Sequence, residues 1–253
     1  MQRAAMAEHG PMIEADGLTK RYGALTALHD FSLDVRAGEI LALVGPNGAG
    51  KTTALKLLVG LLTPTSGTAR LGGYDVMRQP LDAKRILAFL PDQPFLYEQL
   101  TVAELLGFVG GMYGLAHTLL RSRAAELLTT FGLAEQVDRR ISQLSYEMKS
   151  RLVLIASLLH DPKVLILDEP FFGLDPQTLR LMKHLLTQRA RQGMAILLST
   201  HQLFIVEGLA HRIAVLSQGR LVALGTWAAL KEAHGGPHLE EVFFQLTSPV
   251  HAR

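Results

Sequence analysis

Apolar runs of strand length alternate with amphipathic helical segments along most of this chain. Residues 12–44 have strand patterns that end in the apolar run "EILALVG", and further apolar strands are expected in "KVLILDEP" and "MAILLSTHQ". Helical spacing follows in "PNGAGKTTALKLLVGLL" and in "PQTLRLMKHLLTQRARQG". Strands that are apolar throughout and alternate with helices are typical of a parallel sheet covered on both faces. The pattern therefore predicts an α/β fold.

Two stretches depart from this alternation. "TSGTARLGGYDV" and "RIAVLSQGRLVALG" are expected to form hairpins, the second turning at Gln218-Gly219. From about residue 82 to 160 the apolar spacing is helical, which predicts a helical lobe inserted at about 95–160. In its last helix, Met148, Leu152, Ile155 and Leu159 form one stripe, which we interpret as core packing. Residues 1–11 are expected to be a disordered tail, so that 12–253 form one domain.

Composition narrows the classes of protein that fit. The chain has 253 residues and a net charge of only +2, which argues against a dedicated nucleic-acid binder. It contains no cysteine, which excludes disulfides, thiolate metal sites and a cysteine nucleophile. We find no window of 18 uncharged apolar residues, so any membrane role is expected to depend on a partner.

The segment "GPNGAGKT" matches the pattern G-x-x-x-x-G-K-[ST] and lies between an apolar strand and a helix. Glycines let the backbone curl so that several N–H groups point at phosphate oxygens, and the helix N-terminus adds positive partial charge. Lys51 is expected to reach the terminal phosphates, and the Thr52 hydroxyl is expected to ligate Mg²⁺. The motif predicts a site for a nucleoside triphosphate; the alternative is an ordinary glycine-rich turn.

Acidic and histidine side chains follow two other apolar strands. Asp168 and Glu169 end "VLILDE", where parallel strands face the phosphate crevice. Asp168 is expected to hold Mg²⁺ directly or through water, and Glu169 to accept a proton from an attacking water. His201, after "LLST", is placed to donate to the γ-phosphate. The alternatives are two acids that begin a loop and a structural or merely exposed histidine.

The order and spacing of these motifs resemble the nucleotide-binding subunit of ATP-binding cassette (ABC) transporters, from about Met12 to the end. "LDEPFFGLDP" resembles that family's acid strand and the following loop, in which Asp175 lies at the dimer interface. "LEEVFFQLT" resembles the tail of the bacterial exporter type. Tyr22 lies where the family stacks an aromatic ring on adenine. The resemblance assigns ATP binding to Tyr22, Ser145 and the loop residues Gly45, Pro46, Asn47, Gly48, Ala49, Gly50, Lys51, Thr52 and Thr53.

The resemblance also implies an architecture and partners. The fold is expected to be a P-loop NTPase core with an N-terminal antiparallel β subdomain and an inserted helical subdomain. ATP and Mg²⁺ are the expected cofactors, with Lys51, Glu169 and His201 as catalytic residues. Two cassettes, as a homodimer or heterodimer, would enclose two ATP molecules and drive a transmembrane permease subunit. The protein would then be cytoplasmic and peripheral on the inner face of the membrane, without a nucleic-acid partner.

The chain departs from the family in its signature motif, which reads "LSYEM" instead of LSGGQ. Ser145 is retained and is expected to be the N-cap of the following helix. Tyr146 and Glu147 replace two glycines, and Glu147 falls in the first helical turn, where a carboxylate suits the helix dipole. The same carboxylate would repel the phosphates of an ATP docked there, unless it points away.

The glutamine loop is also irregular, since the family often has Pro-Gln-x-Pro and this chain has "LPDQPFLY". Asp92 takes the glutamine position and Gln93 is shifted by one, and either is a candidate Mg²⁺ ligand; for Gln93 a simple turn between prolines is the alternative. Phe95, Leu96 and Tyr97 are expected either to form a groove for the membrane partner or to pack in the core.

The leading hypothesis is therefore the ATPase subunit of a bacterial exporter. A second hypothesis is a regulatory or structural cassette in which the altered signature impairs hydrolysis. A third is a cassette protein acting on ribosomes or DNA, which the nearly balanced charge and the lack of a second cassette disfavour. The transported substrate does not follow from the sequence.

Overall fold

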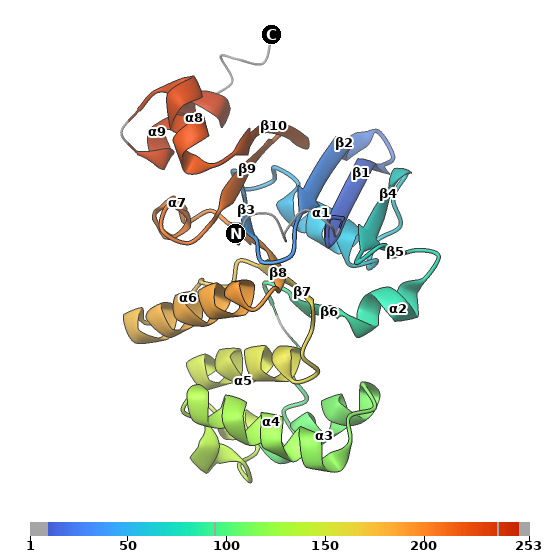
Figure 1. Ribbon diagram of the computed structural model, residues 1–253, viewed down its shortest axis with the longest axis vertical. Coiled ribbons are helices and arrows are strands. Elements are labelled where there is room, and N and C mark those ends of the chain that lie inside the picture. The colour runs from blue at the N-terminus through green and yellow to red at the C-terminus, as the bar shows by residue number, and fades with distance from the viewer. Residues whose placement is uncertain (1–9, 94, 237, 248–253) are drawn as a thin grey trace, which may run out of the picture.

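The computed structural model of the protein describes residues 10–93, 95–236 and 238–247. Most of the predicted tail, residues 1–9, therefore lies outside the described residues, as do residues 248–253. The described part is built from two sheets and a group of helices (Figure 1). None of its helices is long and apolar enough to cross a membrane.

The larger sheet has six strands. They are β3 (Ile40–Val44), β6 (Leu87–Leu90), β7 (Val164–Asp168), β8 (Ala195–Thr200), β9 (Arg212–Ser217) and β10 (Arg220–Gly225). Their order is β10-β9-β3-β8-β7-β6, and every pairing is parallel except the β9–β10 hairpin. In that hairpin Gln218 and Gly219 both have positive φ, as a tight two-residue turn requires. The predicted mostly parallel α/β sheet is confirmed.

The smaller sheet has four strands and is antiparallel. Its strands are β1 (Ile13–Tyr22), β2 (Leu25–Val35), β4 (Ser66–Leu71) and β5 (Tyr74–Asp75), in the order β2-β1-β4-β5. Helix α1 (Lys51–Leu58) packs with this sheet in a core that also takes Leu41 and Leu43 of β3. Because Ile40, Ala42 and Val44 belong to the opposite core, β3 is buried on both faces, which explains its continuous apolar sequence.

The remaining helices follow the strands or form the predicted lobe. They are α2 (Pro80–Arg85), α3 (Val102–Met112), α4 (His117–Thr130), α5 (Tyr146–Leu158), α6 (Pro176–Arg191), α7 (Leu203–Val206), α8 (Trp227–His234) and α9 (Leu239–Thr247), with 3₁₀ turns at Ala134–Gln136 and Ile141–Gln143. Helices α3, α4 and α5 lie together at one end of the molecule (Figure 1). They lie between β6 and β7 in the sequence.

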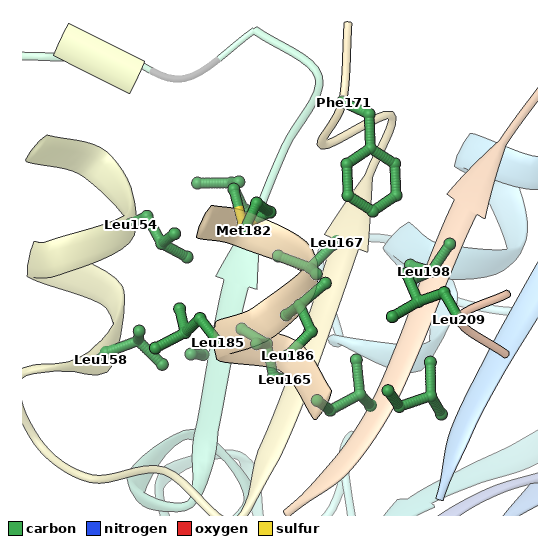
Figure 2. Close-up of a cluster of buried hydrophobic side chains, with 14 of the residues drawn as sticks. Leu154, Leu158, Leu165, Leu167, Phe171, Met182, Leu185, Leu186, Leu198 and Leu209 are labelled. Atoms are coloured by element: carbon green, nitrogen blue, oxygen red, sulfur yellow. The ribbon is translucent and has the colours of Figure 1, made fainter. Parts of the chain in front are cut away.

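The helical lobe shares a hydrophobic core with the larger sheet. Figure 2 shows Leu154 and Leu158 of α5 beside Met182 and Leu185 of α6, which in turn covers β7 and β8. The stripe predicted on α5 is buried here: Leu152, Ile155 and Leu159 are fully enclosed and Met148 packs against the same core. Helix α6 therefore lies between the lobe and the sheet.

Strand β6 is a finding that the sequence pattern missed, because residues 82–95 read as the beginning of the helical region. Leu87–Leu90 instead pairs with β7 at the edge of the larger sheet. A buried strand of four residues is too short for its periodicity to be distinguished from that of a helix. The loop that leaves β6 carries Asp92 toward the ends of the neighbouring strands.

Candidate active site

The loop from Gly45 to Gly50 joins the end of β3 to the beginning of α1, as the sequence predicts. A Cβ atom at Gly45 would lie 2.4 Å from the carbonyl oxygen of Leu216, and one at Gly50 would lie 2.6 Å from that of Ala27. Gly50 also has a φ of 105°, a conformation that side chains disfavour. Close backbone packing therefore requires glycine at positions 45 and 50.

This loop forms the floor of an open cleft with a volume of about 500 Å³. Seven of the predicted loop residues line it, namely Asn47, Gly48, Ala49, Gly50, Lys51, Thr52 and Thr53. Asp92 and Glu169 line the same cleft, although they come from the loops after β6 and β7. Gly45 and Pro46 do not line it; they form the beginning of the loop and accept hydrogen bonds from Lys51.

Part of the cleft wall was not predicted. It comes from Leu25, Thr26 and Ala27 at the beginning of β2 and from the Gln218-Gly219 turn. The Gly219 amide donates to the carbonyl of Ala49 at 2.9 Å, so that this hairpin supports the loop. A hairpin far away in the sequence gives no local sign that it will meet the loop.

Lys51 is folded back against its own loop. Its ammonium donates to the carbonyl oxygens of Gly45 at 2.7 Å and Pro46 at 3.2 Å, and the residue is only 8% exposed. Burial lowers the pKa of the Lys51 ammonium, and the carboxylates of Glu169 and Asp168 act in the opposite direction. An ammonium has three donors, so a further one is available to a phosphate oxygen in the cleft.

The two acids lie where β7 ends and where a crevice is expected in a parallel sheet. Asp168 is buried, and its Oδ1 accepts a hydrogen bond from the Ser199 hydroxyl at 2.5 Å. Glu169 has a φ of 49° and its carboxylate turns toward His201. His201 Nδ1 lies 3.0 Å from Glu169 Oε1, and the His201 backbone amide donates to Oε2 at 3.3 Å. The structure thus brings Glu169 and His201 together.

Asp92 and Gln93 occupy different positions. Asp92 lines the cleft, a small inner cavity beside Asp168 and Glu169, and a large apolar groove. Burial, together with the charges of Asp168 and Glu169, raises the pKa of the Asp92 carboxyl, and His201 acts against this shift. Gln93 lines only the groove. The geometry therefore favours Asp92 over Gln93 as the candidate Mg²⁺ ligand, because only Asp92 lines the cleft.

Two other predicted residues lie away from the cleft lining. Tyr22 is 47% exposed at the end of β1, with the Lys20 ammonium 5.1 Å from its ring centroid. Its cross-strand partner Leu25 does line the cleft. Ser145 is at the N-terminus of α5, where its side chain accepts from the Met148 amide at 3.2 Å, as an N-cap does.

The altered signature residues are on the surface. Tyr146 is 62% exposed, and its Cε1 lies 3.4 Å from where a Cβ on Gly173 would be. Glu147 is exposed in the first turn of α5. Asp175 begins α6 as its N-cap, where it accepts from the amides of Gln177 and Thr178, and the Arg151 guanidinium lies 3.7 Å away.

The loop after β6 also forms the apolar groove, which has a volume of about 1020 Å³. Phe95 and Tyr97 meet edge to face with ring centroids 5.5 Å apart, and Tyr97 meets Phe108 of α3 in the same way at 5.8 Å. Phe95 is 83% exposed. Of the two alternatives for these aromatic residues, exposure and the groove agree with a docking surface, while Leu96 packs partly against the core.

The donors around the cleft fit a magnesium ion that shares its ligands with phosphate. Thr52, Asp92 and Glu169 line the cleft and Asp168 lies next to Glu169, so that all the candidate ligands are oxygen atoms. Within the described residues, no group of three or more His, Cys, Asp or Glu side chains is placed to hold a metal alone. Mg²⁺ typically takes one or two carboxylates and completes its shell with phosphate oxygens and water.

Comparison with known proteins decides the family. A family model described as "ABC transporter" matches residues 28–172, which is more than half of the 253 residues. The chain belongs to the ABC transporter family. The match includes the phosphate-binding loop, the altered signature of this ABC protein and the two acids Asp168 and Glu169 at the end of β7. The resemblance stated from the motifs is thereby confirmed.

Relatives and solved structures agree with this assignment. The linearmycin resistance ATP-binding protein LnrL of Bacillus subtilis is 37% identical, with 93% of this chain and 75% of that protein covered. The Nod factor export ATP-binding protein I of Paraburkholderia xenovorans is 39% identical, with 91% and 76% covered. A solved structure of an ATP-binding subunit of an ABC transporter has a TM-score of 0.89 at 33% identity, with 93% and 99% covered.

Proposed function

We propose that this chain is the ATP-hydrolysing subunit of an ABC exporter and drives a separate membrane subunit. The observation that carries the proposal is the cleft, in which a complete phosphate-binding loop faces Glu169, next to Asp168. Relatives that are named as resistance and export ATP-binding proteins support the exporter type. None of these relatives favours the alternative of a regulatory cassette.

In this proposal each group of the cleft has a role. The loop amides and Lys51 would hold the β- and γ-phosphates, and Thr52, Asp168 and Asp92 would hold a magnesium ion beside them. The ion, when bound, neutralises part of the charge on the phosphate oxygens. Glu169 accepts the proton of the attacking water, and His201 holds that carboxylate and donates to the γ-phosphate. Tyr22 stacks on adenine at the cleft mouth, beside Leu25.

The position of Ser145 supports a two-cassette site. Ser145 caps α5 and does not line the cleft of its own chain, so its contact with ATP requires a second cassette. The second cassette is either another copy of this chain or a related chain. In both cases α5 of one subunit would face the phosphate-binding loop of the other.

The apolar groove supports a membrane partner. Exposed aromatic rings rarely gather around a groove of this size unless the groove is covered in an assembly. We assign it to a segment of the transmembrane permease subunit, which would hold this chain at the inner face of the membrane. Asp92 lines both the groove and the cleft, so a partner bound in the groove would be linked to the nucleotide site through this residue.

Steady-state hydrolysis of Mg·ATP tests the proposal. Glu169→Gln keeps the size of the side chain but removes the general base, so we expect turnover to fall by about 10²- to 10⁴-fold with ATP binding retained. Glu240→Gln, at an exposed position of α9, is the matched control and should hydrolyse ATP like the unaltered protein. Hydrolysis that Glu169→Gln leaves unchanged would exclude Glu169 as the base.

A further inference from the structure

Ser199 and Thr200 are the two polar residues at the end of strand β8, whose other residues are apolar, and both are completely buried. A buried hydroxyl without a hydrogen-bond partner costs free energy, so its presence in a core strand calls for a partner. The parallel register of β7 and β8 pairs Ser199 with Asp168. The sheet therefore fixes Ser199 beside the acids of the cleft.

The Ser199 hydroxyl is bonded on both sides. It donates its single proton to Asp168 Oδ1 at 2.5 Å, and its oxygen accepts from the Glu169 amide at 3.2 Å. The Glu169 amide also lies 3.1 Å from the Ser199 carbonyl oxygen. One side chain thus contacts the carboxylate of the first acid and the backbone of the second.

Each contact restricts a group that the chemistry uses. Donation to Oδ1 holds the Asp168 carboxylate in one orientation and leaves Oδ2 free of this bond. Glu169 has a φ of 49°, which is unfavourable for a residue with a side chain and persists only where the surroundings impose it. The two bonds from its amide to Ser199 hold this conformation, which turns the carboxylate toward His201.

We propose that Ser199 is a positioning residue that orients Asp168 toward the metal and Glu169 toward the attacking water. The inference rests on the proposed function, because it assigns Ser199 to the same site. Ser199 does not line the nucleotide cleft, and its side chain bonds to both acids, so we expect its effect to reach the reaction through them. Removing the hydroxyl should therefore weaken metal binding and turnover without changing metal-free binding of ATP.

Ser199→Thr and Ser199→Val form a matched pair, since both add the same volume to the strand and only Thr keeps the hydroxyl. Ser199→Ala removes the hydroxyl without added volume. Ser157→Ala is a control for the loss of a partly buried serine hydroxyl, because Ser157 donates to the Val153 carbonyl within α5, away from the cleft. Each variant is compared by its melting temperature before its function is measured.

The metal readout is Mn²⁺ titration by electron paramagnetic resonance in the presence of a non-hydrolysable ATP analogue. Partners that orient a metal ligand typically contribute 10- to 100-fold to metal affinity or activity. We therefore expect the Mn²⁺ affinity of Ser199→Val to be about tenfold lower than that of Ser199→Thr. We expect kcat to fall similarly, with the affinity for the analogue in EDTA unchanged. Ser157→Ala should retain both metal affinity and kcat.

The outcomes separate this inference from the proposed function. An unaltered protein that neither hydrolyses Mg·ATP nor binds Mn²⁺ with the analogue would overturn the function itself. If the unaltered protein is active but Ser199→Val and Ser199→Thr have the same metal affinity and the same kcat, only the role of Ser199 is overturned. If Ser199→Val loses affinity for the metal-free nucleotide as well as for the metal, the positioning role is likewise contradicted, because this result would indicate general disruption of the cleft.

Discussion

The carboxylate of Glu169 is held by His201 from two directions. His201 Nδ1 lies 3.0 Å from Oε1, and the His201 backbone amide donates to Oε2 at 3.3 Å. The Glu169 side chain is mostly buried and the His201 side chain is half exposed. The ring contact depends on the His201 side chain, whereas the amide contact does not.

His201→Ala should therefore lower turnover while leaving part of the orientation of Glu169 intact. Misplacement of a reacting group by about 1 Å can cost roughly a hundredfold in rate, and we expect a loss of this order. Turnover and ATP affinity are measured separately, because the same change also removes the proposed contact of His201 with the γ-phosphate. His184→Ala, an exposed histidine of α6, is the control. Full activity of His201→Ala would contradict the role assigned to this pair.

Glycine substitutions should have opposite effects at two positions. A Cβ on Gly45 would lie 2.4 Å from the Leu216 carbonyl oxygen, so Gly45→Ala forces the loop away from β9. We expect a loss of about 1–3 kcal/mol in the free energy of unfolding, together with loss of ATP binding. Gly107, exposed within α3, has nothing within 4 Å of an added Cβ, and Gly107→Ala should stabilise by about 0.5–1 kcal/mol.

Urea unfolding and nucleotide titration of the two variants check this prediction. The Gly107 variant also serves as the control for ATP binding, since its helix lies in the lobe, away from the phosphate-binding loop. A Gly45→Ala protein that binds ATP normally would show that β9 can move aside and that the close approach is not required.

Much of the site was predictable because its residues are contiguous. The loop from Gly45 to Thr53 and the pair Asp168–Glu169 follow apolar strands, so that local pattern and parallel-sheet geometry suffice to place them. Ser199 was missed because its role depends on a partner 31 positions away, which only the register of β7 with β8 brings into contact.

Other misses have the same physical origin. The cleft wall formed by the Gln218-Gly219 turn depends on how two sheets meet, which periodicity does not report. Strand β6 is too short for its pattern to be distinguished from a helix. The choice between Asp92 and Gln93 depends on which side chain the loop turns toward the cleft, and only the three-dimensional fold contains this information.

A partly buried histidine that follows α5 should make stability depend on pH. His160 stacks on Tyr113 with ring centroids 3.7 Å apart, and its Nε2 lies 3.0 Å from the Leu87 carbonyl oxygen. Burial lowers the pKa of His160; the Leu87 contact and Asp161 act against this shift, and Arg123 acts with it. The neutral ring is thus favoured in the folded state.

The direction of the pH dependence follows from the linkage between proton binding and folding. Because the folded pKa is below the ordinary 6.5, stability is full above pH 6.5 and is lost as the pH falls through the folded value. His160→Gln keeps a neutral donor for Leu87 and should flatten this dependence. Melting temperatures between about pH 8 and pH 5 measure it, with the exposed His184→Gln as the control. An equal slope in the unaltered protein and His160→Gln would contradict the assignment.

The altered signature predicts that Glu147 stabilises helix α5 but lowers catalysis. Glu147 is exposed in the first turn of α5, where its charge favours the helix by about 0.3–1 kcal/mol. In the proposed two-cassette site this turn would face the γ-phosphate bound to the other subunit. Two unit charges about 4 Å apart repel by roughly 4 kcal/mol at an effective dielectric near 20, so a carboxylate that faced the phosphate would oppose closure of the proposed dimer.

Glu147→Gln removes the charge and keeps the size and most of the helix propensity of the side chain. We expect a slightly lower melting temperature, about a tenfold rise in turnover, and stronger ATP-dependent dimerisation in a Glu169→Gln background, measured by gel filtration. Glu135→Gln, at an exposed 3₁₀ turn of the same lobe, should change neither property. Unchanged turnover in Glu147→Gln would mean that the carboxylate points away from the phosphate, because a carboxylate that faced the phosphate would lower turnover by repulsion.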